Sequence, residues 1–179
     1  MKRIIIIALC LCLLLCGCAP SFSETDGSIL KEFIQTFPFY STELDSAVDW
    51  FNGHRDYTVE HTDTSTNTVE VLYKGNFAWQ IAASCYTPSN LINLKGYYVT
   101  FRSDAYYSEQ SAQDNFDCIV DELTELCGNP ADTSDGGTVK TFYYKQLKIV
   151  VAVGKTINLT MYYENPFSFS NICSEVPKA

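Results

Sequence analysis

Hydrophobic positions repeat with a helical period near the start of the chain. Ser28 is predicted to cap a first helix that runs through Phe37 and that Pro38 stops. A second helix follows, capped by Ser41 or Thr42 and ended by Gly53. The buried side of the first helix is either Ile29, Phe33 and Phe37 or Leu30, Phe33, Ile34 and Phe37. The two segments predict a helical hairpin.

A third helical period runs from Ser108 to Cys127 and ends at Gly128, with a wide apolar stripe that includes Leu123. Between and after the helices, hydrophobic positions alternate with a period of two residues, which is typical of strands. Seven strands are expected, over residues 57–61, 69–74, 77–85, 94–101, 138–144, 147–153 and 157–163. Residues 132–137 are expected to be a loop. The fold class is therefore α+β, with antiparallel sheet or sheets packed by helices.

Within the first 17 residues, the basic pair Lys2 and Arg3 is followed by an almost continuous run of apolar residues. Such a run is typical of a secretory signal and is short for a membrane-spanning helix, although a retained helix is the alternative. The order Leu15-Cys16-Gly17-Cys18 resembles the lipobox of bacterial lipoproteins. The resemblance implies that residues 1–17 are removed, that Cys18 carries a diacylglyceryl group, and that the protein is anchored to the membrane outside the cytoplasm.

The remaining 162 residues fit one domain. Residues 18–27 are interpreted as the lipidated Cys and a polar tether, and residues 28–179 as a single α+β domain. All 25 aromatic residues follow Cys18, so a sizeable core is expected. Because Lys2 and Arg3 leave with the signal, the net charge changes from −9 to −11, which disfavours nucleic acid and anionic lipid surfaces as partners.

Catalytic and metal-binding patterns are scarce. His54 and His61 lie near acidic residues up to Asp63, so a metal-dependent or acid–base enzyme using residues 54–63 is one hypothesis. No third spaced ligand accompanies the two histidines, and solvated charge is the favoured interpretation, so no metal, no cofactor and no catalysis are expected. Cys85, Cys118, Cys127 and Cys173 allow three disulfide pairings or remain reduced.

The two halves of the domain are similar to each other. Residues 67–83 align without a gap to residues 137–153, and the alignment predicts that Leu72 matches Phe142 in bulk and in face. Repeat units over 28–102 and 103–164, followed by a tail over 165–179, are one hypothesis; unrelated hairpins with a common period are the other. A helix followed by a meander, used twice, loosely resembles the tandem domains of beta-lactamase inhibitory protein and of small outer-membrane assembly lipoproteins.

Tyrosines occur in four adjacent pairs, which begin at Tyr97, Tyr106, Tyr143 and Tyr162. Neighbours in a strand point to opposite faces, so each pair in a strand is expected to send one ring inward and one outward. The same alternation predicts a face turned away from the helices, formed by Gln80, Val150, Ala152, Thr160 and Tyr162. The alternative is that the C-terminal tail covers this face through Phe167, Phe169 and Ile172.

These patterns favour a lipid-anchored binding module outside the cytoplasm that takes a surface protein or cell-wall glycan as its partner. A structural or envelope-assembly lipoprotein is the second hypothesis, and the enzyme is the third.

Overall fold

The computed structural model describes residues 21–77, 79–86, 96–103 and 108–163. The helices in these ranges are α2 (Glu24–Thr36), α3 (Leu44–Gly53), α4 (Glu109–Cys127) and the short 3-10 helix η1 (Asp135–Gly137). The strands are β1 (Tyr57–Asp63), β2 (Thr68–Tyr73), β3 (Trp79–Tyr86), β4 (Gly96–Ser103), β5 (Asp132–Ser134), β6 (Val139–Tyr144), β7 (Leu147–Val153) and β8 (Ile157–Tyr163).

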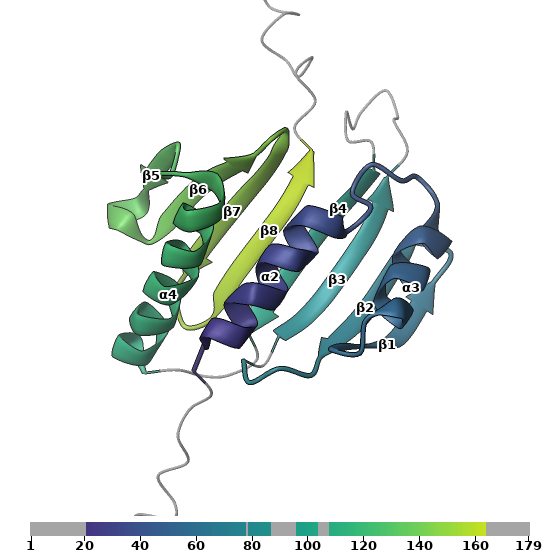
Figure 1. Cartoon of the computed structure of the whole chain (residues 1–179), viewed down its shortest axis with the longest axis horizontal. Helices are drawn as coiled ribbons and strands as arrows, with labels where there is room; N and C mark the ends of the chain where they lie inside the picture. Colours follow the sequence, from purple (N-terminus) through teal and green to yellow (C-terminus); the bar gives the residue numbers. More distant parts are fainter. Residues whose placement is uncertain (1–20, 78, 87–95, 104–107, 164–179) are drawn as a thin grey trace, which may run out of the picture.

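The eight strands form one antiparallel sheet in the order β1-β2-β3-β4-β8-β7-β6-β5. Each half of the domain contributes a four-stranded meander, and the last strands of the two meanders, β4 and β8, pair with each other. All three α-helices lie on one face of this sheet, α3 over β1 and β2, α2 over the middle, and α4 over β6 and β7 (Figure 1). The expected α+β class with an antiparallel sheet packed by helices is confirmed.

Alternation of side chains directs one residue in two toward the helices. In the second meander Leu147, Ile149 and Val151 are buried, as are Ile157, Leu159 and Met161 of β8. The tyrosine pairs follow the same rule, since Tyr97 is buried while Tyr98 lies on the other face. The pair that begins at Tyr106 lies outside the described residues.

The core is rich in aromatic rings, and Phe33 of α2 lies at its centre. The Phe33 ring packs against Phe101 of β4 with a centroid distance of 5.0 Å, and against Trp50 of α3 with a centroid distance of 5.2 Å. Leu30 and Ile34 are buried beside it, so the second of the two predicted faces of the first helix is the correct one. These edge-on ring contacts join both helices to the sheet.

The N-cap of the first helix lies five residues earlier than predicted. Ser23, and not Ser28, is its N-cap, and a capping box forms because Ser23 accepts a hydrogen bond from the Asp26 amide while the Asp26 carboxylate accepts one from the Ser23 amide. Asp26 is buried and also accepts a 2.7 Å hydrogen bond from the Tyr73 hydroxyl of β2. Residues 24–27 therefore belong to α2 and not to a tether.

The cap of the second helix also differs from the prediction. Glu43 is the N-cap of α3 and makes no side-chain capping hydrogen bond, whereas the Ser41 hydroxyl accepts a hydrogen bond from the Glu43 amide. The N-terminal end of α3 is held by Tyr97 of β4 instead. The Tyr97 hydroxyl donates to the carbonyl oxygens of Glu43 and Leu44 and accepts a hydrogen bond from the Ala47 amide at 3.2 Å.

Two further predictions are corrected. Residues 132–134 are a short edge strand, β5, and not part of a loop, because Asp132, Thr133 and Ser134 pair with β6. The alignment that matched Leu72 to Phe142 is wrong about the face, since Leu72 is 40% exposed and Phe142 is fully buried. Two residues separate β6 from β7, whereas five residues separate β2 from β3. Because these lengths differ by an odd number, each residue of β6 points to the opposite side of the sheet from the residue of β2 that is aligned with it.

Candidate binding face

The candidate site is the face of the sheet that no described helix covers, here called the helix-free face. Because paired residues of adjacent strands share a side, its side chains form three rows across the sheet. One row is Thr68, Ser84, Tyr98, Tyr162, Lys148 and Tyr143; the next is His61, Glu70, Ala82, Thr100, Thr160, Val150, Thr141 and Asp132; the third is Thr58, Leu72, Gln80, Arg102, Asn158, Ala152, Val139 and Ser134.

All five residues predicted to form a binding face lie on this helix-free face. Thr160 pairs directly with Val150, and Tyr162 lies beside them in the neighbouring row. Gln80 is separated from this group by β4, because β4 lies between β3 and β8. Gln80 is exposed, and the other four residues, Val150, Ala152, Thr160 and Tyr162, are partly exposed.

Strand β4 supplies three residues of the face that were not among the five predicted ones, namely Tyr98, Thr100 and Arg102. Alternation within β4 was the available signal for Tyr98 and Thr100. Arg102 lies just beyond the predicted end of that strand at residue 101, and the pairing of β4 with β8 that brings it beside Asn158 is not readable from local sequence.

Two tyrosine rings lie side by side at the centre of the face. Tyr98 of β4 and Tyr162 of β8 stack with a centroid distance of 5.5 Å and an interplanar angle of 26°. The Lys148 ammonium, from the strand on the other side of β8, lies 5.8 Å from the Tyr162 ring centroid. The two rings therefore turn a face toward each other, and Lys148 lies over the Tyr162 ring.

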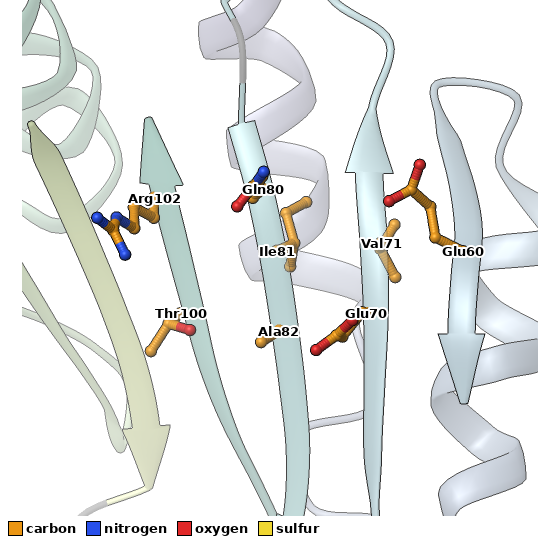
Figure 2. A pocket seen from close by; sticks show the side chains of 8 residues that line it. All are labelled: Glu60, Glu70, Val71, Gln80, Ile81, Ala82, Thr100 and Arg102. Carbon is orange, nitrogen blue, oxygen red and sulfur yellow. The ribbon is translucent and has the colours of Figure 1, made fainter. Parts of the chain in front are cut away.

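A shallow depression of about 240 Å³ lies between β1 and β4 on the same face. Figure 2 shows it from the helix-free side, with the helices behind the strands. Gln80 and Ala82 of β3 lie in its middle, Glu60 and Glu70 lie at the β1–β2 side, and Thr100 and Arg102 lie at the β4 side. Glu60 reaches this face beside His61 because a β-bulge follows Val59 in β1.

The opposite charges around the depression are not paired within the described chain. The side chains of Glu60, Glu70 and Arg102 make no ion pair or hydrogen bond with any described residue. Glu70 and Arg102 are separated by two strand spacings and two residues, or roughly 12 Å between Cα atoms. The depression can therefore offer a cation-binding end and an anion-binding end at once.

The histidines of the hypothetical enzyme site are not brought together. His54 ends α3, where its ring stacks on Trp50 with a centroid distance of 3.9 Å and its Nδ1 lies 2.6 Å from the Trp50 carbonyl oxygen. Asp63 lies at the far end of β1, where its carboxylate accepts hydrogen bonds from Ser65 and Thr66. Among the described residues, no group of three His, Cys, Asp or Glu side chains could hold a metal ion.

The cysteines in the described part of the chain show no sign of activation. Cys85, Cys118 and Cys127 are free thiols in the described part of the chain, and Cys173 lies outside it. Burial raises the pKa of the Cys85 thiol and raises that of Cys127 to about 11, while burial and then Asp121 raise the pKa of Cys118. Each thiol is therefore protonated at neutral pH, which is unfavourable for a nucleophile.

The predicted lipidation site Cys18 and the tail residues Phe167, Phe169 and Ile172 lie outside the described residues. Within the described ranges, no helix has the length and apolarity needed to cross a bilayer. Comparison with protein-family models, with curated proteins and with solved structures found no match for the chain.

Proposed function

We propose that this chain is a membrane-anchored binding module that acts outside the cytoplasm, is not catalytic, and binds a surface protein or cell-wall glycan through the helix-free face. The observation that carries the proposal is the sheet itself: eight strands present one face without a covering helix from the described chain. An anchor at Cys18, expected from the lipobox-like order, would hold this face close to the membrane surface.

The size of the helix-free face fits a protein-sized contact. Eight strands at about 4.8 Å spacing and three rows of side chains give roughly 700 Å², close to the roughly 800 Å² that each partner buries in an interface of standard size. The middle of the face is basic in an otherwise acidic chain, because Arg102 and Lys148 lie there while Glu60, Glu70 and Asp132 lie toward the edges of the sheet. Tyrosine and arginine are enriched at the centres of protein interfaces.

The edges of the described sheet are less suited to binding. Edge strand β1 contains a bulge and places the charged Glu60 there, and edge strand β5 has three residues. Bulges, charges and short lengths all oppose the addition of another strand at an edge. With one face packed by helices, the helix-free face is the surface that supports binding best.

The test is crosslinking in intact cells followed by capture of the full chain. The variant Tyr162→Lys with Ala152→Lys places two ammonium groups on the face, and we expect it to fold and to lose its crosslinked partner. The control is Thr25→Lys with Gln35→Lys, which adds the same charge at exposed positions of α2. Equal capture by both variants would refute the proposal. Loss of folding in the first variant would also refute it, because the face would then be part of the core.

We also propose that the two halves are repeats of one unit, a helical segment followed by a four-stranded meander. Support comes from the shared strand order of the halves and from Phe77, Trp79 and Ile81, which are buried like Leu147, Ile149 and Val151 seventy residues later. A core swap tests this proposal: Trp79→Ile with Ile149→Trp should retain a cooperative thermal transition if the two positions are equivalent, and should unfold the chain if they are not.

A further inference from the structure

The depression between β1 and β4 has the charge pattern of a site for a ligand that carries both signs. Glu60 and Glu70 lie at one side, Arg102 at the other, and neutral side chains lie between them (Figure 2). A ligand with a single charge would leave one end of the depression without a counterion. A ligand whose cation and anion are separated by a distance comparable to the roughly 12 Å between the Glu70 and Arg102 Cα atoms would satisfy both ends.

The volume of the depression favours side chains of a larger partner over a small molecule. About 240 Å³ is less than the roughly 300–1,000 Å³ of pockets that enclose cofactors or drug-sized ligands. The depression is also open, since Glu60, Glu70, Gln80 and Arg102 are all exposed. A volume of this size accepts one or two side chains that project from a surface lying against the sheet.

The tyrosine pair helps to decide between a protein and a glycan. A sugar ring packs best on a flat, exposed aromatic face. Tyr98 and Tyr162 each turn one ring face to the other, and Lys148 lies over the Tyr162 ring, which leaves less flat aromatic surface for a sugar. Ring edges and hydroxyl groups suit the mixed apolar and hydrogen-bonding contacts of a protein interface.

We infer that this depression recognises a peptide segment of a protein partner, with a basic side chain between Glu60 and Glu70 and an acidic side chain on Arg102. The guanidinium can take a carboxylate through two parallel hydrogen bonds, which fixes the orientation of the segment. Two neighbouring carboxylates repel each other less when an ammonium or guanidinium group lies between them. The inference rests on the proposed function, because it gives the chemistry of the partner at the same face.

The test is selection of a displayed library of random dodecapeptides on the full chain in detergent micelles. Peptides selected by the unaltered chain should carry a basic and an acidic residue at a recurring spacing. Glu70→Lys should remove the requirement for the basic residue, and Arg102→Glu should remove the requirement for the acidic one. Each substitution should lower the affinity for the selected peptides by about tenfold or more in binding titrations, because each leaves a charge of the peptide unpaired.

Matched controls separate the depression from general charge effects. Asp121→Lys makes the same charge change as Glu70→Lys at an exposed position of α4, on the other side of the sheet, and Lys155→Glu matches Arg102→Glu at an exposed turn. Both controls should bind the selected peptides like the unaltered chain. No enrichment, enrichment without a charge pattern, or equal binding by all variants would overturn the inference. So would a dimer in sedimentation velocity that Glu70→Lys converts to a monomer, because the occupant would then be a second copy.

Cell crosslinking with the same variants separates this inference from the proposed function. A partner that is lost with Tyr162→Lys and Ala152→Lys but is retained with both Glu70→Lys and Arg102→Glu would leave the binding module standing and overturn the charge recognition. A partner captured equally by every variant would overturn the proposed function itself.

Discussion

Thr100 of β4 lies directly opposite Thr160 of β8, at the point where the two four-stranded meanders meet. The two residues are 60 positions apart in sequence, and their pairing turns two separate meanders into one continuous sheet. Without this contact β4 and β8 would both be edge strands. The pairing also places Arg102 and Tyr98 on the same surface as Tyr162, so the candidate binding face depends on it.

Leu123 tests the helix face that covers the second meander. It is almost fully buried in α4, so Leu123→Asp places an unpaired carboxylate in the core and should lower the free energy of unfolding by about 4 kcal/mol or more. Glu122→Ala removes a partly exposed ion pair with Lys31 and should cost less than about 1 kcal/mol. Chemical denaturation of both variants measures this, and similar midpoints would show that the buried face of α4 is misassigned.

Tyr97 tests the contact between β4 and the start of α3. Tyr97→Phe removes a hydroxyl that bonds to the backbone of Glu43, Leu44 and Ala47, and should lower the free energy of unfolding by about 1–3 kcal/mol. Tyr98→Phe is the matched control, because its hydroxyl makes no hydrogen bond with a described residue, and it should change stability little. Thermal melts that rank the two variants in the opposite order would contradict the assignment.

Asp63 gives a prediction about pH. Hydrogen bonds from Ser65 and Thr66 in the turn after β1 lower the pKa of its carboxyl from 3.8 to about 2. A group whose folded-state pKa is lowered stabilises the fold above its unfolded pKa and loses that effect as the pH falls through the folded value. The melting temperature of the unaltered chain should therefore exceed that of Asp63→Ala above about pH 4, and the difference should shrink as the pH falls toward about 2.

Melting curves between pH 2 and pH 7 measure the Asp63 effect, and a carbon NMR titration of the carboxyl follows its protonation directly. The control is Asp49→Ala, since Asp49 is exposed and accepts no hydrogen bond from a described residue. A difference between the unaltered chain and Asp63→Ala that stays constant over this pH range would contradict the role of the turn.

Cys18 tests the anchor. Cys18→Ala removes the thiol that accepts the lipid in the lipobox interpretation, so the variant should incorporate no labelled fatty acid and should retain its first 17 residues. Cys16→Ala is the control, because it changes the variable position of the same motif and should still be labelled and cut. Equal labelling of Cys18→Ala and the unaltered chain would show that the lipobox interpretation is wrong.

Local alternation was sufficient to predict most strands and the direction of their side chains. It predicted that Leu147, Ile149 and Val151 face inward and that Val150 and Ala152 face outward. Such a prediction is possible because apolar and less apolar residues alternate along a strand that is buried on one side only. It did not predict β5, whose three residues are all exposed and polar. The strand conformation of β5 comes from pairing with β6 and leaves no hydrophobic signal.

Contacts between distant residues account for the other differences. The start of α2 at Ser23 depends on Asp26, and the Asp26 carboxylate is buried because Tyr73, 47 residues later, bonds to it. The mixed charge of the depression depends on the order β1-β2-β3-β4, which brings Glu60 and Arg102 to one surface. A single sequence does not show how deeply a carboxylate is buried, and it does not show which strands lie next to each other in a sheet.

The position of α2 has a consequence for the order of folding. This helix is the first described element of the chain, yet it lies over the middle of the sheet, where β4 meets the last described strand (Figure 1). During synthesis or export from the N-terminus, residues around Phe33 emerge long before β8 exists to complete the surface beneath them. A nascent chain that stops short of residue 157 therefore leaves both an apolar helix side and an unpaired β4 exposed, and folding must wait for the C-terminal meander.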